Sequence, residues 1–264
     1  MYSAHPLVHG FPGKSKSHGA FGWSSLWLLS DARRNILVDT GPFAYIPLIP
    51  QSLERVGLSA DDITDVIFTH LHWDHLANFT MFGQATLWVG QTELNWASDQ
   101  SAGTPFVSDV HVRELLRVGE RLQRVSNGEQ ILGGISVINT PGHTPGHLAF
   151  HLETETGDHI FAGDSVKNIR ELTTARADST MDAEASRASI DRLRSLLRDT
   201  SGLLVPGHDL PLVMNGKSIE RQSSQTIQMS YFPDSDEDER AFDISIPAGT
   251  KLYEREVTNG IPQD

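Results

Sequence analysis

The chain contains no cysteine among its 264 residues. This absence excludes disulfide bonds and thiolate metal ligands, so any metal ion must be held by histidine or oxygen ligands. Basic residues are also few: 21 lysines and arginines stand against 34 aspartates and glutamates, which gives a formal net charge of −13. Because a nucleic-acid backbone requires a basic surface, we expect a small-molecule partner and no nucleic acid.

Long hydrophobic runs are absent as well. No stretch reaches the roughly 20 apolar residues that a membrane-spanning helix needs. The segment from Met1 to Pro6 has neither the basic region nor the apolar region of a secretory signal. We therefore expect a cytoplasmic protein with no membrane partner. The length suits one large α/β domain with a sizeable core.

Histidine, in contrast, is concentrated in the segment His-Leu-His-Trp-Asp-His at residues 70–75. The preceding Val66–Thr69 is apolar and β-branched, and it predicts a strand that ends at this loop. Neutral imidazoles and a carboxylate form a ligand set that zinc, iron and manganese accept. The loop could turn His70 and His72 toward one point and Asp74 and His75 toward a neighbouring one, which favours two metals.

Three further candidate ligands follow at comparable places. His143, Asp164 and His208 each come after an apolar run and a glycine, the pattern of a strand that ends in a tight loop. Ligands at four strand ends indicate one site at one edge of the fold. The alternative, a surface loop that happens to be rich in histidine, does not account for these downstream residues.

These motifs resemble the metallo-β-lactamase superfamily. The resemblance rests on H-x-H-x-D-H, on the downstream ligands in order and on the segment Ile36–Gly41, and it covers most of residues 20–210. It implies a single domain over residues 1–264 with an α/β fold, the four-layer αββα sandwich, and two metals at one edge. The implied ligands are His70, His72 and His143 for one metal, Asp74, His75 and His208 for the other, and Asp164 between them.

The resemblance also suggests supporting residues. Asp39, at a strand end, would orient a ligand histidine, although a turn-forming aspartate is an equal alternative. Trp23, Phe43 and Trp73 are candidates for the wall of a substrate pocket, with core packing as the alternative for Trp73. We expect His147 to lie outside the ligand set.

The expected chemistry is hydrolysis. Two divalent metals about 3.5–4 Å apart lower the pKa of a bridging water, create a hydroxide nucleophile and polarise a carbonyl or phosphoryl oxygen. Asp74 could coordinate one metal and pass a proton to the leaving group. Zn²⁺ is the expected metal, with Mn²⁺ or Fe²⁺ as alternatives.

Within the superfamily, the sequence is most similar to N-acyl-homoserine lactonases. Many of these lactonases carry a tyrosine three residues after the bridging aspartate, where this chain has Lys167. Lys167 could donate to an oxyanion or bind an acidic group of the substrate, or it could be solvated. Opening of a lactone or a related ester or amide carbonyl is our leading hypothesis. The alternatives on the same metals are phosphodiester or phosphotriester hydrolysis and lactam hydrolysis.

Periodicity predicts the surrounding elements. We expect a hairpin of Trp27–Leu29 with Asn35–Val38, a helix over Pro50–Val56, and a longer helix over Asp182–Arg198 that carries one apolar stripe. In residues 230–264, an acidic run predicts a solvated loop, and the alternation at Phe242–Pro247 predicts one short edge strand. A packing role is favoured for this tail, with a homodimer contact as the alternative.

Overall fold

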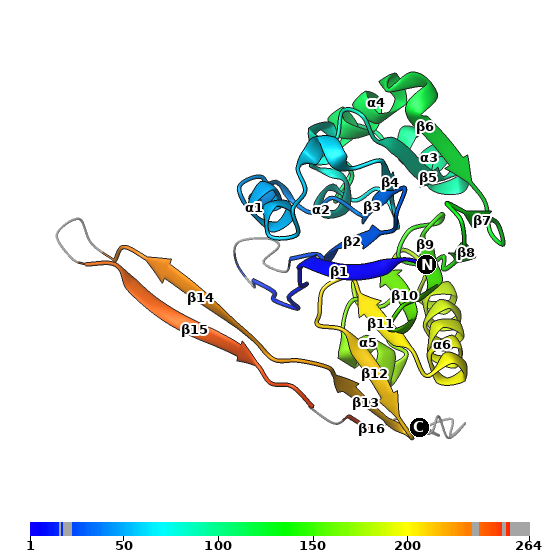
Figure 1. Cartoon of the computed structure of the whole chain (residues 1–264). Helices are drawn as coiled ribbons and strands as arrows, with labels where there is room; N and C mark the ends of the chain where they lie inside the picture. The colour runs from blue at the N-terminus through cyan, green and yellow to red at the C-terminus, as the bar shows by residue number, and fades with distance from the viewer. Residues whose placement is uncertain (16, 18–22, 234–237, 250–251, 254–264) are drawn as a thin grey trace.

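The structure is a computed structural model that describes residues 1–15, 17, 23–233, 238–249 and 252–253. Two large sheets lie one against the other, and a two-stranded ribbon extends away from them (Figure 1). Most of the acidic run of the tail, at residues 234–237, lies outside the described residues. Among the described residues, no helix has the length and apolar character needed to cross a bilayer.

The first sheet has six strands in sequence order. These are β1 (Ser3–Val8), β2 (Leu26–Ser30), β3 (Asn35–Val38), β4 (Asp65–Ile67), β5 (Thr86–Gly90) and β6 (Leu122–Val125). The predicted early hairpin is confirmed by the antiparallel pairing of β2 with β3. Strands β3 to β6 are parallel, so their carboxyl ends meet at one edge, and the loop after β4 carries the histidines to that edge.

The second sheet has eight strands in the order β16-β13-β12-β11-β10-β9-β8-β7. Their bounds are β7 (Gln130–Ile131), β8 (Ile135–Asn139), β9 (Leu148–Thr154), β10 (Gly157–Gly163), β11 (Leu203–Pro206), β12 (Leu212–Asn215), β13 (Ser218–Arg221) and β16 (Leu252–Tyr253). Strands β10 and β11 are parallel, so the loops that carry Asp164 and His208 leave from the same edge.

Helices cover the outer faces of both sheets. On the first sheet lie α1 (Leu48–Glu54), α2 (Trp73–Leu76), α3 (Gln91–Ser98) and α4 (Asp109–Arg117), with short 3-10 turns η1 (Phe43–Tyr45), η2 (Ala60–Asp62), η3 (Phe79–Met81) and η4 (Gly119–Arg121). On the second lie α5 (Ile169–Thr174) and α6 (Ala183–Thr200). The alternation of β2 explains the layers: Leu28 packs under the helices, whereas Trp27 and Leu29 pack between the sheets. The predicted αββα sandwich is confirmed.

Two predicted helices are present with shifted ends. Helix α6 begins after Asp182, whose carboxylate caps it by accepting hydrogen bonds from the backbone N–H groups of Glu184 and Ala185. Its Ile190, Leu193 and Leu197 are buried against the second sheet, as the apolar stripe predicts. Helix α1 begins at Leu48, before Pro50, because proline is tolerated in the first turn of a helix.

The tail differs from the prediction. Residues of the expected edge strand form β15 (Arg240–Ile246), which pairs with β14 (Gln225–Tyr231) in the projecting ribbon (Figure 1). The edge strand of the second sheet is instead β16, next to β13. Alternation reveals which residues share a face, but it does not identify the strand that pairs with them, and this explains the difference.

Candidate metal centre

The segment that runs from β4 into α2 places three histidines and a carboxylate at one edge. His70 lies three residues after the end of β4, His72 is the N-cap residue of the short helix α2, and Asp74 and His75 lie in that helix. The side chains of His70 and His75 are fully buried. Because the chain changes from extended at His72 to helical at Asp74, the loop presents its ligands in two directions.

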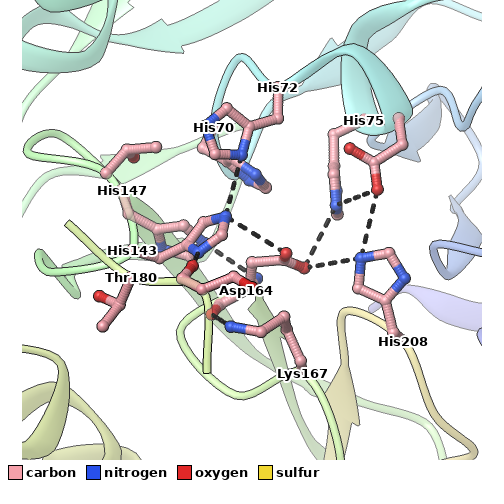
Figure 2. A network of polar contacts seen from close by, with 12 residues as sticks. His70, His72, His75, His143, His147, Asp164, Lys167, Thr180 and His208 are labelled. Atoms are coloured by element: carbon pink, nitrogen blue, oxygen red, sulfur yellow. Dashed lines mark hydrogen bonds and ion pairs between the residues drawn. The ribbon is translucent and has the colours of Figure 1, made fainter. Parts of the chain in front are cut away.

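The second sheet contributes the remaining candidates. His143 comes from the loop between β8 and β9, Asp164 directly follows β10, and His208 follows β11. Figure 2 shows the side chains of His70, His72, His75, His143, Asp164 and His208 converging from these loops. The structure therefore brings all seven candidate ligands of the sequence together, across the two sheets.

The ligand atoms form groups that a metal ion could join. Within each group the atoms lie at most 4.8 Å apart, and the groups are His70, His72 and His143, then Asp74, His75 and His208, and also His70, His75 and Asp164. Asp164 lies between the first two groups: its Oδ2 is 3.3 Å from Nε2 of His143, and its Oδ1 is 3.2 Å from Nε2 of both His75 and His208.

Unpaired buried atoms indicate that this cluster fits metal ions. His70 Nε2, His75 Nε2 and Asp164 Oδ1 are buried and make no well-aligned hydrogen bond among the described residues, although the last two atoms lie 3.2 Å apart as a charged contact. Leaving such atoms unpaired costs about 1–3 kcal/mol each, so an unsatisfied group of this size needs an explanation. Imidazole nitrogens and a carboxylate oxygen that converge in this way are ordinary ligands of a divalent metal.

The two groups differ in their charge. Burial lowers the pKa of His70 and His143 well below the usual value, and that of His72 to about 4, which favours the neutral rings that bind metal. Burial also acts on His208, but the carboxylates of Asp164 and Asp74 outweigh it and raise its pKa to about 9. A metal ion would take the place of such protons, so we expect its affinity to fall in acid.

The carboxylates respond to the same charges. Burial acts to raise the pKa of Asp164, but His208, His75 and His143 more than compensate and hold it well below the usual value. His75 shows the reverse. Burial acts to lower its pKa, but the carboxylates of Asp74, Asp164 and Asp39 outweigh burial and raise the pKa well above its usual value. The three-histidine group therefore favours neutral imidazoles, which can bind a metal. The protonation of His75 and His208 depends instead on the neighbouring carboxylates.

Asp39 and His147 contact the candidate ligands through hydrogen bonds without belonging to the ligand groups. Asp39, at a positive φ of 61°, accepts hydrogen bonds from Thr69 N and Thr69 Oγ1, and its Oδ2 lies 2.8 Å from His75 Nδ1. His147 lies outside the three candidate groups, and its Nε2 accepts a hydrogen bond of 3.0 Å from the backbone N–H of Asp164. Both residues thus fix the direction of a candidate ligand or of its backbone.

A pocket of about 560 Å³ lies over the cluster. Trp73 and Lys167 line it together with five of the candidate ligands. Only 9% of Lys167 is exposed, and its Nζ lies 3.2 Å from Oε1 of the fully buried Glu171. The solvated lysine that the sequence left open is therefore excluded by this burial.

Two aromatic candidates lie elsewhere. Among the described residues, neither Trp23 nor Phe43 lines the pocket. Trp23 forms a β-bridge with Phe11, and the centroids of their rings lie 5.6 Å apart. Phe43 is half-exposed in η1, with its ring 5.1 Å from that of His111. Their expected place in the wall is corrected by these contacts.

Several residues of the wall were not predicted from the sequence, and three of these have an aromatic or charged side chain. Phe106, at a positive φ of 66°, lines the pocket and holds its ring 5.6 Å from the ring of His72. Lys14 and Asp178 also line the pocket and form an ion pair with each other. These residues belong to loops far from the histidine motif in the sequence, and no spacing signal connects them to it.

Comparison with known proteins agrees with this geometry. Residues 21–208 match the Metallo-beta-lactamase superfamily. The N-acyl homoserine lactonase of Bacillus thuringiensis is 25% identical over 159 residues, so the match spans 60% of this chain and only 60% of that protein. Metallo-beta-lactamase domain-containing protein 1 of Xenopus laevis is 26% identical over 230 residues, 84% of this chain and 87% of the relative.

The fold is also similar to solved structures. One is an N-acyl homoserine lactone hydrolase with the product N-hexanoyl-L-homoserine bound at its catalytic metal centre. The two chains are 22% identical, with a TM-score of 0.61 over 79% of this chain and 92% of the other. At this identity, the likeness supports the shared fold.

Proposed function

Because the chain belongs to the metallo-beta-lactamase superfamily, whose members bind metal ions, usually zinc, we propose that it is a dinuclear hydrolase that opens a small lactone or a related ester or amide. The observation that carries this proposal is the pair of ligand groups with Asp164 between them. His70, His72 and His143 would hold one ion, Asp74, His75 and His208 the other, and the two oxygens of Asp164 would reach both.

The residues divide the work according to their positions. Divalent ions bound in such a site supply an acidified water and polarise a substrate oxygen. Asp74 lines the pocket, and its Oδ2 lies 3.3 Å from His208 Nε2. It would therefore act both as a metal ligand and as an acceptor of the proton from the attacking water. It would pass that proton to the leaving group as the ring opens.

The pocket wall supports a carbonyl substrate over a phosphate ester. Two lysines line it, but Lys14 is paired with Asp178, and Lys167 is paired with Glu171. Their charges are therefore largely balanced by Asp178 and Glu171, so the wall would add little positive charge to that of the metal ions for binding a phosphodiester. Trp73 and Phe106 give the wall apolar surface. The lactonase relatives agree with this choice of substrate class.

A substrate panel with metal analysis tests the proposal. Protein purified without chelator should contain about two divalent ions per chain, most of them Zn²⁺, with Mn²⁺ and Fe²⁺ as the alternatives. Its kcat/KM should be highest for N-acyl lactones or simple esters, among lactones, esters, lactams, phosphodiesters and phosphotriesters. A metal content that stays at one ion after loading, or a clear preference for a phosphoester or a lactam, would contradict it.

A further inference from the structure

Glu93 is a buried carboxyl that the proposed chemistry does not use. It lies in the first turn of α3, and 1% of it is exposed. Its carboxylate accepts three hydrogen bonds, from Leu71 N at 2.9 Å, Thr144 Oγ1 at 2.7 Å and Gly146 N at 3.2 Å. All three donors are neutral, and burial raises the pKa of Glu93 to about 7. Burial disfavours the charged form of this carboxyl, and the three hydrogen bonds only partly oppose that effect.

The three donors belong to the two loops that present histidines. Leu71 lies between His70 and His72, in the loop that leaves the first sheet. Thr144 directly follows His143, in the loop that leaves the second sheet. Oxygen Oε1 of Glu93 bonds the first loop and Oε2 bonds the second. One carboxyl group therefore joins the backbones on both sides of the three-histidine group.

Close packing leaves this connection little freedom. A Cβ on Gly146 would lie 2.0 Å from the backbone nitrogen of Glu93, so the second loop can approach α3 only because residue 146 is glycine. A Cβ on Gly90 would likewise lie 3.1 Å from the carbonyl oxygen of Gly146. The start of α3 thus acts as a fixed support against which the loop of His143 rests.

We propose that Glu93 is a positioning residue that sets the separation between His143 and the pair His70 and His72. The inference rests on the proposed function, because these histidines would hold one of the two metal ions. Glu93 contacts the backbone beside the ligands rather than the ligands themselves, so it would act by preorganising the loops. Substitution of a residue that supports metal ligands from outside typically lowers metal affinity or activity by about 10–100-fold.

Asp65 provides a matched control. Like Glu93 it is a buried carboxyl, 1% exposed, but it lies in β4. It accepts hydrogen bonds of 2.8 Å from Trp88 Nε1 and from Arg34 Nη1. These contacts lie within or beside the strands and touch neither ligand loop. An Asp65→Asn variant therefore removes a buried charge without loosening the three-histidine group.

The test is a zinc titration of metal-free protein against a competing chelator, together with thermal unfolding. We expect Glu93→Ala to raise the dissociation constant of one of the two Zn²⁺ ions by about 10–100-fold and to leave the other nearly unchanged. Glu93→Gln keeps one acceptor oxygen and should fall between Glu93→Ala and the wild type. Asp65→Asn should lower the thermal midpoint but leave both zinc affinities unchanged.

A double-mutant cycle assigns the weakened ion to the correct histidines. In a His143→Ala background, replacing Glu93 should add little further loss at the weakened site, because the residue it positions is gone. Equal zinc affinities in Glu93→Gln and the wild type, or a loss shared by both ions in proportion to the thermal midpoint, would overturn the role of Glu93. Wild-type protein that never binds two ions would instead overturn the proposed function, which keeps the two failures distinct.

Discussion

The ligand cluster and the pocket wall differ in how deeply the fold buries them. His70, His75 and Asp164 are at most 5% exposed, and buried groups such as Asp39 bond to the cluster from behind. On the wall, Phe106 is 52% exposed, and the Lys14–Asp178 ion pair is open to solvent. In the proposed function, the reaction would therefore depend on buried positions, whereas substrate choice would depend on a more exposed surface. Substitutions should lose effect as they move outward.

Removal of metal should have the largest effect. If both ligand groups act through bound ions, dialysis against a strong chelator should abolish hydrolysis of the best substrate, and added Zn²⁺ should restore it. Turnover and elemental analysis of the same samples provide the measurement. Turnover that persists in demonstrably metal-free protein would show that the buried cluster does not carry the chemistry.

Replacing Asp74 by asparagine should come next. The amide keeps the shape of the side chain, but it cannot accept the proton that the leaving group requires. We expect kcat to fall by at least about 100-fold while the thermal midpoint stays close to that of the wild type. Metal content must be measured in parallel. Near-normal kcat with two ions bound would mean that another group transfers the proton.

The candidate ligands could be predicted because each lies within a short, self-contained pattern. His70, His72 and Asp74 share one short sequence motif, and Asp164 and His208 each follow an apolar run and a glycine. Such local patterns can be recognised in the sequence without knowing which residues they contact in the folded chain. The four-layer sandwich could be expected because these same motifs carry the resemblance to the superfamily.

Residues that act through tertiary contacts could not be predicted in this way. Glu93 looks like an ordinary first-turn glutamate of a helix, and only the folded chain brings it between two ligand loops. Phe106 and Lys14 reach the pocket from loops of unrelated sequence position. The pairing of β15 with β14 has the same character, because alternation does not encode a partner.

Lys167 and Lys14 allow the comparison to be made with a single residue type. Lys167 is the buried member, placed between Glu171 and the carbonyl of Asp164. If its ammonium group also contacts the substrate, Lys167→Met should lower kcat/KM by about 10–100-fold, the loss of a charge-assisted hydrogen bond of roughly 1.5–3 kcal/mol. A fall in kcat would indicate stabilisation of the transition state. A rise in KM alone would indicate ground-state binding of an acidic group.

Because Glu171 loses its partner in that variant, stability must be measured too. A variant with a lowered thermal midpoint but unchanged kcat/KM would show that Lys167 serves the fold and not the substrate. In that case the contacts that select the substrate would have to come from other wall residues, with Trp73 and Phe106 as the first to examine.

Lys14→Met should have the smallest effect, although it removes the same charge from the same pocket. The side chains of Lys14 and Asp178 are 62% and 43% exposed, so water and salt screen their interaction. Exposed ion pairs contribute about 0–1 kcal/mol, which corresponds to at most about a five-fold change in kcat/KM. The measurement is kcat/KM for Lys14→Met and Lys167→Met at low and high salt. A loss for Lys14→Met as large as that for Lys167→Met would contradict the division between a buried site and an exposed wall, because it would place the exposed lysine in direct contact with the substrate.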